Sequence, residues 1–140
     1  RQYYSRDFIT NKLILEPSIG TLMPLYSGTI SKGRAKELVS LLMNHRKYWL
    51  HHPVPTVALD SHFFDDDRYS QGPSWVNTNW MIIDGLRRYG FIAEAETLRS
   101  LTIDMVQKAG PYEYFSPSEG GGLGAADFSW TAALTIDLLK

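Results

Sequence analysis

Residues 75–110 read WVNTNWMIIDGLRRYGFIAEAETLRSLTIDMVQKAG and predict two consecutive helices of different character. The first runs from Trp75 to Tyr89, has apolar side chains around much of its circumference, and stops at Gly90. The second runs from Ile92 to Ala109, is apolar on one face, and is ended by Gly110-Pro111. We therefore expect the first helix to be the more buried of the two.

The same alternation continues on both sides of this stretch. Upstream, an amphipathic helix is predicted from Ser31 to Trp49 with Ser31 as its N-cap, after a weaker segment, Ile19 to Tyr26, interrupted at Pro24. Downstream, a helix that is apolar nearly all round starts near Ser129, whose hydroxyl is a suitable N-cap. Alternation typical of strands is nearly absent, so the predicted fold class is all-α.

The order amphipathic, buried, amphipathic, buried suggests an outer layer of one-sided helices packed on an inner layer of two-sided ones. In such a ring, the loops before Trp75 and before Ser129 should converge on a shared pocket. Four or five helices do not close a ring, so the chain is predicted to form about half of a helical barrel. Inner helices left bare would favour self-association, because large apolar patches are rarely exposed.

Composition excludes several classes of protein. The 140 residues allow one domain, and 14 basic against 15 acidic residues, net charge −1, give no basic surface for nucleic acid. No apolar run is long enough for a membrane span, and the absence of cysteine excludes disulfides and thiolate metal sites. The composition does not determine the cellular compartment, and we take the cytoplasm as the default expectation. The start, Arg1-Gln2-Tyr3-Tyr4, is neither a signal peptide nor an initiator methionine, and indicates a piece of a longer chain.

Two loops carry the candidate chemistry. Glu113 lies in the pentapeptide PYEYF, where a carboxylate beside aromatic rings suits a general base acting on a sugar; a solvated loop glutamate is the alternative. The stretch 69–75, YSQGPSW, offers aromatic rings that can stack on sugars and an amide that can bond sugar hydroxyls. The alternative is ordinary aromatic packing at the start of a helix. The residues alone leave both alternatives open.

Other polar and glycine-rich segments have simpler interpretations. The Gly120–Gly124 segment lacks the ending of a phosphate loop and is expected to be a mobile flap beside the pocket. The run Asp65–Asp67 lacks the spacing of a calcium loop and is expected to be a solvated acidic turn. The histidines lack zinc-ligand spacing, so we expect neither metal nor cofactor. Of the side chains early in the first helix, Asn77 and Asn79 are expected to hold the neighbouring loop, and Trp80 to lie in the core.

A set of motifs resembles glycoside hydrolase family 63, and they occur in the family's order over nearly the whole chain. They are LMPLYSG (22–28), GPSWVNTNW (72–80), GLRRYG (85–90), YEYFSP (112–117), GLG (122–124) and FSWTAAL (128–134). The resemblance implies an (α/α)6 barrel, of which residues 1–140 form the C-terminal part of a single catalytic domain. It also implies inverting hydrolysis of α-glycosidic bonds. The bacterial branch of the family that has these motif sequences includes mannosylglycerate and glucosylglycerate hydrolases.

The resemblance also assigns roles to residues. It implies that Glu113 is the general base and that Trp75 and Tyr69 line the sugar subsite. We expect Gln71 and Gly72 to shape that subsite. The general acid of the family is an aspartate upstream of the residues present here, so the chain alone is expected to be inactive. The expected partners are a small sugar or glycoside and the missing N-terminal half of the barrel.

We expect Trp130 and the Gly120–Gly124 loop to border the subsite. The chain departs from the family where Tyr69-Ser70-Gln71-Gly72 replaces the usual Tyr-Trp-Arg-Gly. This departure keeps an alternative open, a non-catalytic carbohydrate-binding or assembly module that retains the fold. A trehalase-like hydrolase is a further alternative, which the spelling FSWTAAL disfavours.

Overall fold

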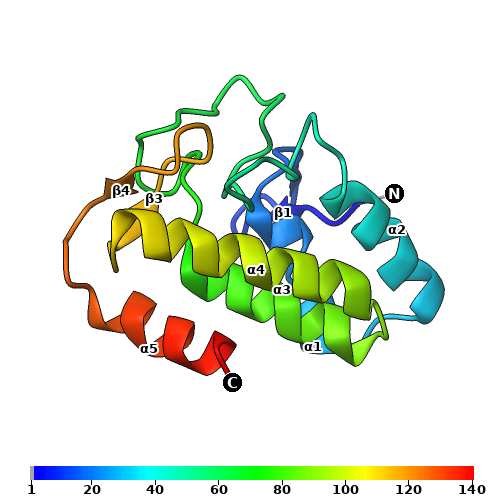
Figure 1. Ribbon diagram of the computed structural model, residues 1–140. Helices are drawn as coiled ribbons and strands as arrows, with labels where there is room; N and C mark the ends of the chain where they lie inside the picture. The colour runs from blue at the N-terminus through cyan, green and yellow to red at the C-terminus, as the bar shows by residue number, and fades with distance from the viewer. Residues whose placement is uncertain (1) are drawn as a thin grey trace.

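The computed structural model describes residues 2–140 and is mostly helical (Figure 1). Within residues 2–140, five α-helices and one 3-10 helix are joined by long loops and two minimal hairpins. The helical elements in chain order are η1 (Ile19–Thr21), α1 (Pro24–Ser27), α2 (Lys32–Leu42), α3 (Val76–Arg88), α4 (Ile92–Ala109) and α5 (Ser129–Leu138). The strands are β1 (Ser5–Arg6) with β2 (Leu13–Ile14), and β3 (Tyr114–Phe115) with β4 (Gly122–Leu123), both pairs antiparallel. This architecture confirms the all-α prediction.

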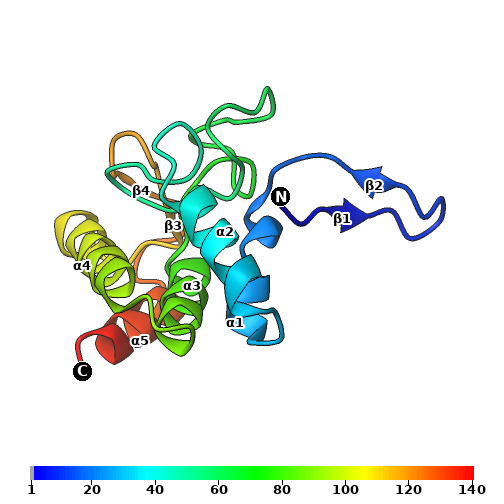
Figure 2. The ribbon, with the colours of Figure 1, turned by 90° about the vertical axis from the view of Figure 1, so that its right-hand side faces the viewer.

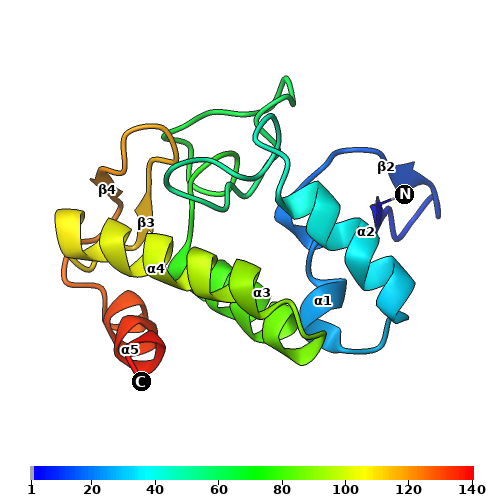
Figure 3. The ribbon, with the colours of Figure 1, turned by 45° about the vertical axis from the view of Figure 1, so that its right-hand side comes forward.

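The centre of the molecule is the antiparallel pair α3 and α4, which lie side by side in Figures 1 and 3. Ile82 and Leu86 on α3 and Leu98 and Met105 on α4 are buried, and they form part of one continuous apolar core. The turn between the helices depends on Gly90, whose φ of +86° is unfavourable for residues with a Cβ. The bounds of both helices agree with the sequence prediction to within one residue.

Helix α1 crosses α3 at very short range, at Gly85. A Cβ on Gly85 would lie 2.7 Å from the carbonyl carbon of Leu25 and 2.8 Å from the nitrogen of Tyr26. Contacts this short do not occur between real atoms, so only glycine lets the two backbones approach this closely. Pro24 begins α1 at its first turn, where proline is favoured. The predicted single segment interrupted at this proline is therefore two short helices.

Helix α5 packs on α3 and α4 through one side only. Thr131 and Leu138 are buried, whereas Trp130, Ile136 and Leu139 are 51%, 62% and 56% exposed. A helix that is apolar all round and covered on one side agrees with a partial barrel. The prediction that Ser129 caps this helix is wrong, because the helix begins at Ser129 and the residue before it holds the N-cap position without a side-chain bond.

Helix α2 begins as predicted but ends early. The Ser31 hydroxyl accepts a hydrogen bond from the Arg34 N–H at 3.3 Å and caps the first turn. The helix stops at Leu42 and not at Trp49, because Asn44 starts a turn instead. The Asn44 side-chain oxygen accepts from the Arg46 N–H at 2.9 Å, a local bond that competes with the helix.

Residues 43–75 form a long loop without helices, which runs above the helical layer in Figure 3. Isolated bridges tie this loop to other segments, pairing Ser18 with Val57 and Ser74 with both Pro55 and Phe115. The hairpin of β1 and β2 projects away from the helices in Figure 2. Within the described part of the chain, none of the helices is long and apolar enough to cross a membrane.

Candidate active site

The loop that enters α3 meets the hairpin that follows α4. The N–H of Ser74 donates to the carbonyl of Phe115 at 2.8 Å, and the N–H of Phe115 donates back to Ser74 at 2.9 Å. The Ser74 hydroxyl also donates to the carbonyl of His52 at 2.7 Å, which ties in the long loop. This junction confirms that the two loops leading into α3 and α5 meet, whereas neither of the two cavities described below is lined by Tyr69, Trp75 or Glu113.

Three aromatic rings meet at the junction. Trp75 and Tyr114 stack with their centroids 5.0 Å apart and an interplanar angle of 19°. Tyr69 stands edge-on to both, 5.0 Å from Trp75 and 5.3 Å from Tyr114. The indole N–H of Trp75 donates to the Tyr69 carbonyl at 3.0 Å and fixes the orientation of the ring. Tyr69 and Trp75 were predicted to lie together, whereas Tyr114 was not among the predicted site residues although it follows Glu113 directly.

Glu113 lies beside this cluster and is half-buried. Its N–H donates to the Ala125 carbonyl at 2.9 Å, and its Oε2 accepts from the Ala125 N–H at 3.3 Å. Gly124 has φ of +72°, and a Cβ there would lie 2.7 Å from Oε2 of Glu113 and 2.6 Å from Cε1 of Tyr114. Glycine therefore lets the backbone approach both side chains. Within residues 2–140, Oε1 of Glu113 accepts no hydrogen bond and is open to another partner.

Gln71 and Gly72 close a compact loop that carries Tyr69. The Gln71 N–H donates to the Arg68 carbonyl at 2.7 Å, and the Gln71 carbonyl accepts from the Asp65 N–H at 2.8 Å. A Cβ on Gly72 would lie 2.0 Å from the Asp65 carbonyl oxygen, so no other residue fits. The side chain of Gln71 forms no hydrogen bond with another described residue.

Trp130 lies on the first turn of α5, away from the three rings. It lines a cavity of about 200 Å³ that Asn77 and Trp80 on α3 also line. Oδ1 of Asn77 is buried and has no hydrogen-bond partner within the described residues, so the prediction that Asn77 holds a loop is not supported. Trp80 is half-buried at the edge of the core and not inside it, and its indole N–H donates to Asp137 at 2.9 Å.

Asn79 holds the neighbouring loop as predicted. It is fully buried, accepts from the Val54 N–H at 3.0 Å and donates to the Pro53 carbonyl at 2.7 Å. Its amide also donates to the Thr102 hydroxyl on α4 at 3.1 Å. These bonds fix residues 53–54 against α3. Those residues directly follow His52, whose carbonyl accepts from the Ser74 hydroxyl at the junction.

The glycine-rich segment, expected to be a mobile flap, forms the end of the hairpin turn and the strand β4. The Ser116 N–H donates to Gly121 at 2.9 Å, and the Gly120 N–H donates to Ser116 at 2.8 Å. Gly120 lies on the ring of His52, where a Cβ would be 2.4 Å from Nε2. Burial, followed by the nearby charges of His51 and Lys108, lowers the pKa of His52 below its usual value.

The acidic run 65–67 is solvated only in part. Asp65 and Asp67 are exposed as predicted, but Asp66 is half-buried. The Asp66 carboxylate accepts hydrogen bonds from Ser116 and Ser118 in the β3–β4 turn. No pattern in the sequence indicates this contact. No group of three metal-ligating side chains occurs among residues 2–140.

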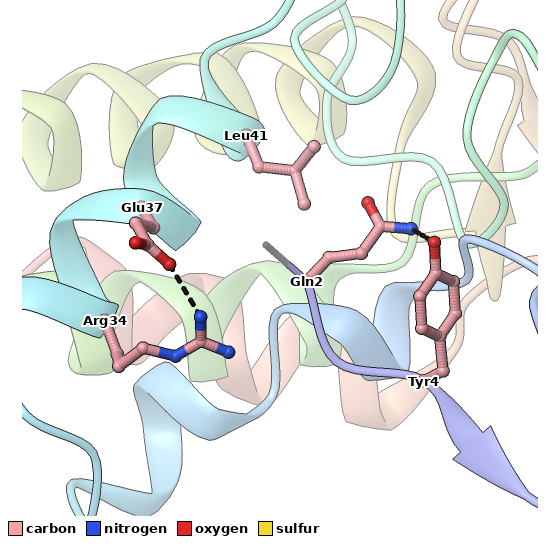
Figure 4. Close-up of a pocket in the computed structure, with 5 residues that line it drawn as sticks. All are labelled: Gln2, Tyr4, Arg34, Glu37 and Leu41. Atoms are coloured by element: carbon pink, nitrogen blue, oxygen red, sulfur yellow. Dashed lines mark hydrogen bonds and ion pairs between the residues drawn. The ribbon is translucent and has the colours of Figure 1, made fainter. Parts of the chain in front are cut away.

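A larger cavity lies elsewhere, between the N-terminal segment and α2 (Figure 4). It measures about 580 Å³, and Gln2, Tyr4, Arg34, Glu37 and Leu41 line it. Arg34 and Glu37 satisfy each other in an ion pair of 2.6 Å. None of the predicted site residues lines this cavity, so the convergent loops remain the candidate site.

Residues 1–131 match the family model described as a mannosylglycerate hydrolase MGH1-like glycoside hydrolase domain. The chain belongs to this family. Together with the family 63 crystal structure described next, the match confirms the resemblance to glycoside hydrolase family 63.

Similar proteins include mannosylglycerate hydrolases. The chain is 36% identical over 137 residues to a mannosylglycerate hydrolase from Thermus thermophilus, covering 96% of this chain. It is 47% identical over 88 residues, 61% of this chain and 20% of the relative, to one from Rubrobacter radiotolerans. A crystal structure of a family 63 mannosylglycerate hydrolase from Thermus thermophilus in complex with glucose superposes with a TM-score of 0.92 at 34% identity, covering 99% of this chain. The chain spans about a third of the length of these Thermus proteins, 32% and 35%.

Proposed function

We propose that this chain is the C-terminal part of an (α/α)6 catalytic barrel that hydrolyses small α-glycosides such as mannosylglycerate or glucosylglycerate. The remaining part of the barrel comes from the same polypeptide or from a separate chain. The exposed apolar side of α5 supports this arrangement, because Trp130, Ile136 and Leu139 would be covered by the rest of the ring. No cofactor is needed for this reaction.

Glu113 is the general base of the proposed reaction. Its Oε2 is oriented by the Ala125 N–H, and its Oε1 is free to accept a proton from water. In an inverting reaction, that water attacks the anomeric carbon while a carboxylic acid on the other side protonates the leaving oxygen. The two carboxyl groups lie about 6.5–9.5 Å apart in such enzymes. The acid would come from the remaining part of the barrel, so this chain alone would be inactive.

The aromatic cluster forms the sugar subsite. The stacked Trp75 and Tyr114 and the edge-on Tyr69 present apolar ring surface for the C–H face of a pyranose. The amide of Gln71 is not engaged by another described side chain and is available to sugar hydroxyls. Gly72 sets the shape of the loop that carries Tyr69.

The observation that carries the proposal is the position of the Glu113 carboxylate, held by Ala125 with one free oxygen, beside the ring cluster. The test uses the complete enzyme with α-mannosylglycerate and α-glucosylglycerate, and follows the anomer of the released sugar by NMR. We expect hydrolysis of at least one substrate with the β-anomer appearing first. Appearance of the α-anomer would exclude inversion. Sugar binding without hydrolysis would favour the carbohydrate-binding module.

A further inference from the structure

Asp66 connects two loops that are distant in sequence. Its Oδ1 accepts from the Ser118 N–H at 3.2 Å and from the Ser118 hydroxyl at 2.9 Å, and its Oδ2 accepts from the Ser116 hydroxyl. The three donors all belong to the turn between β3 and β4. Figure 1 shows the loop before α3 passing beside this turn. Asp66 is therefore a side-chain tie between the loop and the hairpin, at the opposite end of the loop from the Ser74–Phe115 backbone pair.

On one side, the tie acts on the loop that carries Tyr69 and Gln71. The Asp65 N–H donates to the Gln71 carbonyl, and the Arg68 N–H donates to the Asp65 carbonyl at 3.3 Å. Residues 65–72 thus close on themselves, and Gly72 packs directly on the Asp65 backbone. A loop closed in this way moves as a unit, so a displacement of its acidic end displaces Tyr69 as well.

On the other side, the tie acts on the hairpin that carries Glu113. The Ser116 hydroxyl accepts from the Glu119 N–H at 3.0 Å while it donates to Asp66. The Ser116 N–H donates to Gly121, which sets the register of β3 against β4. That pairing leads to the contact of Glu113 with Ala125. The hydrogen bond between Ser116 and Asp66 therefore lies three residues along the chain from Glu113, the proposed base.

We propose that Asp66 is a positioning residue that sets the sugar-contacting loop against the hairpin bearing Glu113. The inference rests on the proposed function, because it concerns the alignment of substrate with that base. A carboxylate suits this position because its two oxygens together accept from all three donors. An asparagine at this position would direct its N–H₂ group at the Ser116 hydroxyl, which already accepts from the Glu119 N–H and would have to reverse its bond. Small misplacements of aligned groups are costly to rate, of the order of 100-fold for about 1 Å.

The test measures kcat and KM of the complete enzyme with Asp66→Asn, Ser118→Ala and the pair of changes combined. We expect Asp66→Asn to lower kcat/KM by about 10- to 100-fold per folded enzyme. Ser118→Ala should cost less, because it removes one of the three donors, and the combined variant should fall below Asp66→Asn, because asparagine still offers its Oδ1 to Ser118. Asp67→Asn is the matched control, since that neighbouring side chain is exposed and forms no hydrogen bond within residues 2–140. Its kinetics should match the unmodified enzyme.

The outcomes separate this inference from the proposed function. If Glu113→Gln abolishes turnover while Asp66→Asn stays within about twofold of the unmodified enzyme, the positioning role is wrong and the proposed base stands. If Glu113→Gln leaves turnover intact, the proposed function fails and the role of Asp66 falls with it. A loss with Asp66→Asn that is fully explained by a smaller folded fraction would also overturn the positioning role. If Asp66→Asn does not fold, Ser118→Ala decides, and unchanged kinetics in that variant would refute the proposal.

Discussion

Replacing Asn79 with alanine is expected to reduce the free energy of unfolding by about 2–5 kcal/mol. Asn79 is fully buried and joins α3 to the Pro53–Val54 backbone and to Thr102 on α4. Alanine would leave the Val54 N–H and the Pro53 carbonyl buried without partners, and each such group costs about 1–3 kcal/mol. Thr102 adds less, because its hydroxyl keeps the bond it donates to Leu98 at 2.7 Å. Urea unfolding of the complete protein followed by tryptophan fluorescence measures the change.

Asn77→Ala is the control for this measurement. Asn77 lies two residues earlier on α3, and its buried Oδ1 has no partner within residues 2–140, so its removal orphans nothing there. We expect a change below about 1 kcal/mol in this variant. Equal losses in the two variants, or a loss below about 1 kcal/mol for Asn79→Ala, would refute the view that Asn79 fixes the loop.

The remaining predictions concern packing, pH and sugar binding. Gly85→Ala should destabilise the fold by about 1–3 kcal/mol, because its Cβ would meet the α1 backbone. Gly33→Ala, at an exposed position on α2, should be neutral or stabilising. Equal effects of the two changes in thermal melts would contradict this reasoning. The lowered pKa of His52 means that the unfolded state takes up a proton that the folded state disfavours, so stability should fall as pH drops below 6.5. His52→Gln should flatten that acid-side slope in urea titrations, and an unchanged slope would rule His52 out. Trp75→Ala should raise the KM for the glycoside several-fold by removing the ring that stacks on Tyr114, and calorimetry with the sugar should show the same loss, whereas unaltered binding would exclude a subsite here.

The helices could be predicted from the sequence where local signals are strong. The periodicity of residues 76–109, with Gly90 and Gly110 as stops, was sufficient for α3 and α4. The end of α2 was missed because Asn44 forms a local turn that apolar spacing does not reveal. The two hairpins were missed because strands of two residues carry no periodic pattern.

The candidate site was predictable in its residue types but not in its connections. The aromatic loop and Glu113 could be paired because helix order brings the preceding loops to one end of the structure. The contacts of Asp66 with Ser116 and Ser118 span 50 and 52 residues, so no local pattern distinguishes Asp66 from its solvated neighbours. Trp130 was placed near the subsite by motif, whereas the structure puts it in the cavity beside Asn77.

The most direct test of the account is the turnover of the complete enzyme with Glu113→Gln, measured on α-mannosylglycerate and α-glucosylglycerate. Glutamine keeps the shape of the side chain and still offers an oxygen to the Ala125 N–H, but it cannot take a proton from water. We expect kcat to fall by at least about 100-fold, while the melting temperature and the affinity for the released sugar stay close to those of the unmodified enzyme. Turnover within a few-fold of normal would remove Glu113 from the mechanism and with it the central claim.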